Sequence, residues 1–75
     1  MGKELVIILD TMSQEKMSAI RKTLESHRGD KRVMLKSGVS NKLYLADKSM
    51  WVTLTMTLIN ELSSIVGREN VIVNH

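Results

Sequence analysis

Residues 17–35 read MSAIRKTLESHRGDKRVML and join an amphipathic pattern to an alternating one. Three apolar residues recur at spacings of three and four, so they share one face of an α-helix: Met17, Ile20 and Leu24. We expect this helix to run to about His27 and to end at Gly29, because glycine adopts a left-handed conformation at little cost. Val33 and Leu35 then alternate with other residues, which predicts a strand with these two side chains facing inward.

The same arrangement recurs at an offset of 38 residues. The matching positions are Ile20 and Leu58, Leu24 and Leu62, Gly29 and Gly67, Val33 and Val71, and Leu35 and Val73. This internal repeat predicts two similar βαβ units that share one sheet. Right-handed crossovers would place both helices on the same face of that sheet. The expected arrangement is therefore ferredoxin-like or split βαβ.

The segments before the repeat supply a strand and a helix start. Residues 5–9, LVIIL, form a short apolar run rich in β-branched residues, which is typical of a central strand. Either Thr11 or Ser13 can cap the first helix, and Gln14 completes a capping box with Thr11.

The middle of the chain predicts a β-hairpin. Residues 32–36 and 42–46 both alternate, and we expect Leu43 and Leu45 to face inward. Between them lies the turn cluster SGVSN at residues 37–41.

The last third predicts a helix between two strands. Residues 50–52 are candidates for one extra short edge strand, Thr53 or Thr55 can cap the second helix, and residues 70–73 form the final strand. The fold class is thus α+β, with the order β-α-β-β-α-β in a two-layer sandwich.

Composition sets limits on this domain. Its 75 residues allow one domain with a core that is largely aliphatic, because there are one Trp, one Tyr and no Phe. The absence of cysteine excludes disulfides and thiolate metal sites and favours a reducing, cytoplasmic setting. No apolar run approaches the roughly 18 residues that cross a bilayer, so we expect no membrane partner.

The polar residues do not form a recognisable catalytic motif. The acidic residues fall mostly at the ends of predicted elements or on polar helix faces, and no two of them form a pair suited to acid–base chemistry. Neither His27 nor His75 has a second ligand at metal spacing, and the four glycines are isolated rather than gathered in a phosphate loop. We therefore expect no enzyme activity, no metal and no cofactor.

A basic cluster is the first candidate binding site. Residues 21–36 hold six basic and two acidic residues, within a chain whose formal charge is +3. The candidate nucleic-acid-binding residues are Arg28, Lys31, Arg32 and Lys36. They could bind single-stranded DNA weakly and in a salt-dependent way. The predicted strands lack the aromatic pairs of an RNA-recognition sheet, and an ordinary charged surface would look the same.

Trp51 is the second candidate binding site. It lies beside Met50 and close to Met56, just before the second helix. A partly exposed tryptophan among methionines would offer an adaptable contact surface for a partner protein. A lone tryptophan can equally fill a core or its rim.

Two stretches resemble the C-terminal region of bacterial DNA polymerase III alpha subunits. HRGDKRVML, at residues 27–35, is similar to the segment HPG-x-x-P-V-x-L of that family, although Arg28 and Arg32 stand where the family often has proline. The second signature of the region is matched by Trp51, Val52, Thr55, Leu58, Leu62, Gly67, Asn70 and Val71. With the strand at residues 5–9, the resemblance covers most of the chain.

This resemblance implies a role in DNA replication. Residues 1–75 would be a single domain, a C-terminal module cut from a longer polymerase chain whose catalytic aspartates lie in other domains. The C-terminal region of the family is associated with docking to the clamp-loader tau subunit. The implied function is therefore a non-catalytic interaction module for a replisome protein.

Overall fold

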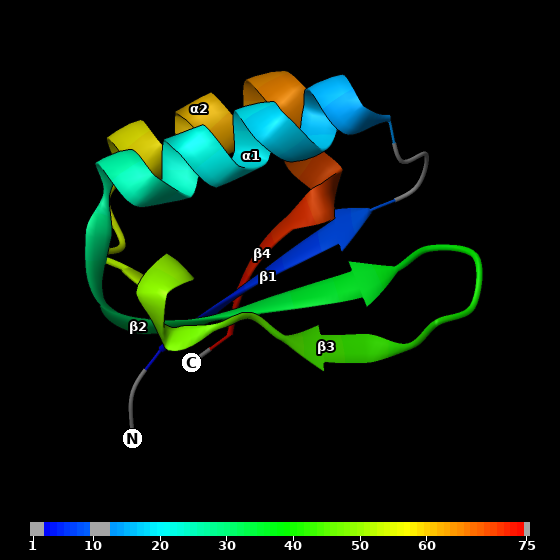
Figure 1. Cartoon of the computed structure of the whole chain (residues 1–75), viewed down its shortest axis with the longest axis horizontal. Helices are drawn as coiled ribbons and strands as arrows, with labels where there is room; N and C mark the ends of the chain where they lie inside the picture. Colours follow the sequence, from blue (N-terminus) through cyan, green and yellow to red (C-terminus); the bar gives the residue numbers. More distant parts are fainter. Residues whose placement is uncertain (1–2, 10–12, 75) are drawn as a thin grey trace.

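A computed structural model describes residues 3–9 and 13–74, which form one four-stranded mixed sheet with two helices on one of its faces (Figure 1). The main elements are β1 (Glu4–Leu9), α1 (Gln14–Ser26), β2 (Arg28–Ser37), β3 (Leu43–Leu45), α2 (Met56–Val66) and β4 (Val71–Asn74). Two short 3-10 helices complete the order: η1 (Lys48–Met50) before α2 and η2 (Arg68–Asn70) after it. The predicted α+β class and the two-layer βαββαβ sandwich are confirmed.

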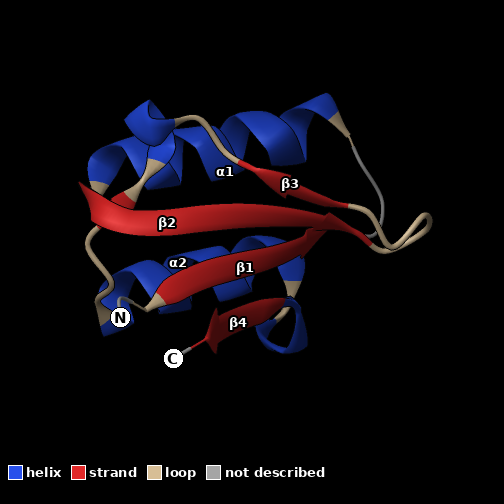
Figure 2. Cartoon of the chain, turned by 90° about the horizontal axis from the view of Figure 1, so that it is seen from below, coloured by secondary structure: helices blue, strands red, loops and turns tan. Residues whose placement is uncertain are grey.

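The strand order is β3-β2-β1-β4. β1 and β2 are parallel neighbours, so the first βαβ unit is continuous, with α1 as its crossover. β3 is antiparallel to β2, and β4 is antiparallel to β1, so the two edge strands run in the same direction. The second unit, β3-α2-β4, is therefore split around the first. Figure 2 shows the uncovered face of the sheet with both helices behind it, as the repeat predicted.

The core fills the space between the sheet and the two helices. Among the described residues it consists of nine buried aliphatic side chains: Leu5, Ile7, Ile20, Leu24, Val33, Val52, Leu58, Leu62 and Val71. Leu5 lies opposite Val33 in the parallel pair, and Ile7 lies opposite Val71 in the antiparallel one. These residues face the helices because side chains alternate between the faces of a strand.

Both helices have capped starts. The Ser13 hydroxyl accepts a hydrogen bond from the Lys16 amide at 3.1 Å, and the Thr55 hydroxyl accepts one from the Leu58 amide at 3.1 Å. These are the cap geometries that serine and threonine favour, because they satisfy amides that have no partner within the helix. Thr11, the alternative first cap, lies outside the described residues.

The prediction for Gly29 was wrong. α1 ends at Ser26 with His27 as its C-cap, and Gly29 is already part of β2. Among the described glycines, Gly67 is the one with a positive φ, 95°, at the end of α2. Gly29 instead allows a close backbone approach, since a Cβ there would come within 2.5 Å of the Thr53 nitrogen.

The orientation of β3 was also predicted wrongly. Leu43 and Leu45 are 54% and 56% exposed, and they pair with Lys36 and Met34, on the face of the sheet without helices. The register explains this: Tyr44 lies opposite Leu35, which packs against the core, so Tyr44 faces the helices and its two neighbours face away. At an edge strand this short, the apolar pattern alone does not set the face.

The extra short strand predicted at residues 50–52 does not form as a strand, and Val52 alone of these residues pairs with the sheet. Met50 closes η1, and Val52 forms isolated bridges with Arg28 and Lys31 of β2. Val52 is fully buried, so this bridge attaches the segment between η1 and α2 to the core. Neither α1 nor α2 has the length and apolar content needed to cross a bilayer.

Candidate functional site

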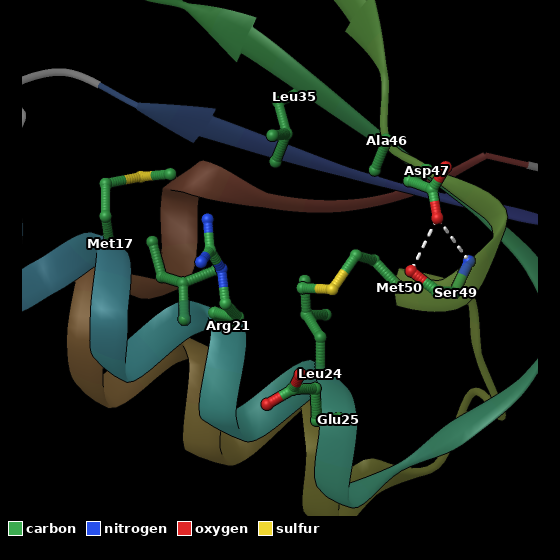
Figure 3. A pocket seen from close by; sticks show the side chains of 10 residues that line it. Met17, Arg21, Leu24, Glu25, Leu35, Ala46, Asp47, Ser49 and Met50 are labelled. Atoms are coloured by element: carbon green, nitrogen blue, oxygen red, sulfur yellow. Dashed lines mark hydrogen bonds between the residues drawn. The ribbon is translucent and has the colours of Figure 1, made fainter.

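A groove separates α1 from the β2–β3 side of the sheet, and we call it the α1–β3 groove. Its larger cavity, of about 500 Å³, is drawn in Figure 3. A second cavity of about 350 Å³ continues toward Tyr44 and shares Met17 and Leu35 with the first. Both are hollows open to solvent on one side, with volumes within the range of small-molecule pockets.

The groove is mainly apolar. Its apolar lining residues are Met17, Ile20, Leu24, Leu35, Ala46 and Met50 in the larger cavity, and Leu9 and Tyr44 in the smaller one. Met17 and Met50 approach from opposite sides, one from α1 and the other from η1 (Figure 3). Because methionine side chains are unbranched and flexible, they can adjust to different apolar partners.

The position of Met50 depends on the η1 turn. The Asp47 carboxylate accepts hydrogen bonds from the Ser49 hydroxyl at 2.5 Å and from the Ser49 amide at 3.0 Å (Figure 3). These two bonds stabilise the charged carboxylate and lower the pKa of Asp47 below its usual 3.8, with the hydroxyl bond the larger cause. The turn thus holds Met50 at one end of the groove.

One cation stands over the groove. Arg21 extends from α1 toward the sheet, and its guanidinium forms no ion pair with another residue of the described ranges (Figure 3). Glu25, one turn further along α1, and Asp47 also line the rim. The carboxylate of Asp47 is held by Ser49. Among the described residues that line the two cavities, Arg21 is the one cation, so it is the group there that could pair with an anion.

The structure separates the three residues predicted to bind a partner protein. Met50 lines the groove, whereas Trp51 and Met56 are not among the lining residues of its two cavities. The Trp51 indole N–H donates to the Ala46 carbonyl at 3.1 Å, and its partly buried ring packs against the core. Lys48 lies over this ring at 5.9 Å from its centroid, a cation–π arrangement. Met56 is 65% exposed at the start of α2.

The predicted basic cluster is divided between the two faces of β2. Arg32 and Lys36 lie at alternate positions on the uncovered face, where the register places them opposite Glu4 and Ile8. Lys31 falls on the other side of the strand by the same alternation. Its amino group is 4.0 Å from the Asp30 carboxylate. Arg28 opens β2 at the bridge to Val52, outside the register that places Arg32 and Lys36.

The uncovered face of the sheet carries an apolar row. The register places Leu45, Met34, Val6 and Ile72 side by side across the four strands. Val6 is only 6% exposed, whereas Ile72 is 38% exposed and Leu45 56% exposed. Since Tyr44 faces the helices, the described strands place no aromatic side chain on this face.

One pair of polar side chains joins the helices. His27 Nε2 lies 2.7 Å from Glu61 Oε1, across from the end of α1 to α2. Within residues 3–9 and 13–74, no three potential metal ligands of the His, Cys, Asp or Glu type gather in one place. The His27–Glu61 contact links the C-cap of α1 to the middle of α2.

Sequence reasoning missed several residues of the groove. Met17 and Leu35 were recognised as core-facing positions, but their exposed parts line a cavity; Arg21 and Tyr44 were not singled out. The helical and strand periods gave the faces of Met17 and Leu35, whereas the strand pattern placed Tyr44 on the wrong face.

Comparison of the chain with protein-family models, with curated proteins and with solved structures gives no match. The resemblance to the C-terminal region of polymerase III alpha subunits therefore stays a prediction.

Proposed function

We propose that this chain is a non-catalytic protein-interaction module that binds an apolar segment of a partner in the α1–β3 groove. The observation that supports the proposal is the groove itself, a largely apolar hollow with Met17 and Met50 on opposite sides and Leu35 at its floor. Burying such a hollow under a partner removes apolar surface from water, which is the main driving force of association.

The resemblance to the polymerase supplies a first partner to test. A module at the end of a replicative polymerase chain would act in the cytoplasm, where it would dock a replisome protein such as the clamp-loader tau subunit. The groove overlaps the resemblance in part: Leu9 and Leu35 lie in matched segments, whereas Met50 lies just before the second stretch, which begins at Trp51.

Titration of the isotope-labelled chain with the tau subunit of the same organism, followed by NMR, tests this proposal. We expect the amide signals of the groove, with Met17, Leu35 and Met50 as reporters, to shift on binding. Met50→Gln should weaken binding about tenfold or more, because it places an amide in an apolar contact.

Met56→Gln is the matched control, since Met56 is an exposed methionine outside the groove. It should leave the affinity unchanged. Equal losses for both variants would instead favour a contact centred on Trp51 and the two flanking methionines, as the sequence predicted. An unperturbed groove at saturating partner concentration would contradict the proposal.

A second candidate function is weak binding of single-stranded DNA through Arg32 and Lys36, which share the uncovered face of the sheet. The double variant Arg32→Glu and Lys36→Glu should abolish binding of a thymidine oligonucleotide, and wild-type binding should fall steeply with salt. Arg28→Glu with Lys31→Glu is the matched control, because it reverses as much charge elsewhere. Equal effects of the two double variants would argue against a contact on this face.

A further inference from the structure

We propose that the α1–β3 groove takes its partner as an added β-strand. The partner segment is extended, pairs with the free edge of β3, carries apolar side chains at alternate positions and places one acidic side chain against Arg21. This inference rests on the proposed function and specifies the conformation and chemistry of the segment that binds.

The first support is the free edge of the sheet. β3 is the terminal strand in the order β3-β2-β1-β4, so it has a strand on one side only. Toward β2, the Ala46 amide donates to the Val33 carbonyl at 2.8 Å, and the Lys42 carbonyl accepts from the Ser37 amide at 2.9 Å.

The outward backbone groups follow from this pattern. Backbone groups alternate in direction along an antiparallel strand, and Tyr44 pairs directly with Leu35 of β2. The amide and carbonyl groups of Leu43 and Leu45 therefore point away from the sheet. An extended segment can satisfy all four of them, as in other complexes formed by strand addition.

The second support is the match between this edge and the groove. Side chains directly opposite each other in paired strands lie on the same face, so a partner residue opposite Tyr44 faces the helix layer. On that face Tyr44 lines the smaller cavity together with Met17 and Leu35. Side chains on one face of a strand are two residues apart. The next partner side chain on this face therefore lies beside Ala46, which lines the larger cavity.

The third support is charge. Ala46 and Arg21 line the same cavity, and Arg21 lacks an ion-pair partner among residues 3–9 and 13–74. Glu25 and Asp47 line the same cavity, and the Asp47 carboxylate is held by Ser49. An acidic side chain beside Ala46 can form a charge-assisted hydrogen bond with the Arg21 guanidinium, which extends toward the sheet (Figure 3). We therefore expect the partner to carry an apolar residue opposite Tyr44 and, two positions away, an Asp or Glu beside Ala46.

The free edge disfavours a helix as the occupant, because a helix would leave the outward groups of Leu43 and Leu45 without backbone partners. A second copy of this chain could also pair with this edge. In an antiparallel pair of two β3 strands centred on Tyr44, Lys42 of one copy would come opposite Ala46 of the other, in the cavity that Arg21, Glu25 and Asp47 line. Formation of such a dimer is therefore one of the outcomes of the test.

Selection from a phage library of random peptides of about ten residues, against the whole chain, tests the inference. We expect the enriched peptides to alternate apolar and other residues, with an acidic residue two positions from an apolar one. Binding of an enriched synthetic peptide should slow hydrogen exchange at the Leu43 and Leu45 amides.

Three changes to this complex separate backbone pairing from side-chain contact. N-methylation of the peptide amides that face Leu43 and Leu45 keeps the side chains and should weaken binding more than about tenfold. Leu43→Pro removes one outward N–H, which an edge strand tolerates, and should weaken binding similarly. Arg21→Glu should lower the affinity about tenfold for the acidic peptide and restore it for the peptide with lysine in place of the acid.

The outcomes distinguish the two proposals. Enriched peptides with helical spacing, insensitive to N-methylation but weakened by Met50→Gln, would overturn strand addition and leave the groove as a binding site. Enriched peptides unaffected by Met50→Gln, Arg21→Glu and Leu43→Pro would overturn both proposals. Formation of a dimer through β3, seen by sedimentation together with protection of Leu43 and Leu45 in the peptide-free chain, would overturn the proposed occupant.

Discussion

Gly29 and Gly67 occupy equivalent positions in the internal repeat, yet different constraints require glycine at each. At Gly67 the backbone has φ 95° and ψ 143°, a region that is essentially closed to other residues. Gly29 lies in β2 and its φ is not positive, so the constraint there is the neighbouring chain: a Cβ would lie 2.6 Å from the Val52 carbonyl carbon. The repeat therefore reflects two glycines with distinct structural roles.

Gly29→Ala tests this distinction. The added methyl group meets backbone atoms of Val52 and Thr53, so β2 and the adjoining segment must move apart. We expect a loss of about 1–3 kcal/mol in the free energy of unfolding, measured by urea denaturation. Gly38→Ala, at an exposed turn position whose φ is not positive, is the control and should change stability little. Equal stability of the two variants would show that the approach at Gly29 is loose.

At the scale of the element, η1 is a three-residue turn whose stability depends on one carboxylate. Asp47 is exposed, and its pKa is lowered by the hydroxyl and then the amide of Ser49. A pKa that is lower in the folded state than in the unfolded chain means that the ionised carboxylate stabilises the fold. This contribution is present above the unfolded pKa and is lost as the pH falls through the folded one.

Asp47→Asn is therefore expected to destabilise the chain near neutral pH and to matter progressively less as the pH drops below the usual carboxyl pKa of 3.8. Urea unfolding of both proteins across this pH range measures the difference. Ser49→Ala, which removes the hydroxyl donor and keeps the amide donor, should produce a smaller change with the same pH dependence. A difference that persists undiminished at acid pH would show that the ionised form is not what stabilises η1.

The elements differ in how far their sequences determine them. The helices and their buried faces were predicted because Ile20, Leu24, Leu58 and Leu62 follow a helical period that a core must bury. β3 was placed correctly, but its facing was not, because an edge strand of three residues has exposed positions on both faces. The groove could not be predicted, since it forms where α1, β2, β3 and η1 meet, and no local period encodes that meeting.

At the scale of the whole molecule, the two ends of the described chain lie together. β1 and β4 are antiparallel neighbours, with Glu4 opposite Asn74, and the Asn74 side-chain amide donates to the Glu4 carboxylate at 3.4 Å. The pairing of β1 with β4 thus closes a loop of almost the full chain length. Closure of so long a loop costs entropy before the contacts form, which slows folding.

A circular permutant tests this view of the architecture. If the ends of the chain are joined by a short Gly-Ser linker and the chain is opened between Val39 and Ser40, β4 and β1 become a local hairpin. The opening lies in an exposed turn, where Val39 is 86% exposed, so the core loses no side chain. We expect the permutant to keep the NMR amide spectrum of the core and to fold with a changed rate.

The same permutant separates the β3 edge from the rest of the domain. β3 becomes the first strand and loses its covalent turn to β2. It is then held to β2 by the ladder of Met34, Leu35 and Lys36 with Leu45, Tyr44 and Leu43, and by the flanking hydrogen bonds of Ala46 and Lys42. We expect faster hydrogen exchange at Tyr44, whose amide faces β2, and weaker binding in the groove, because strand addition requires an ordered β3. Opening the chain at Arg68 instead, at the start of η2 and away from the groove, is the matched comparison. If both permutants bound peptide equally while Tyr44 exchanged faster in the first, order at the β3 edge would not govern binding.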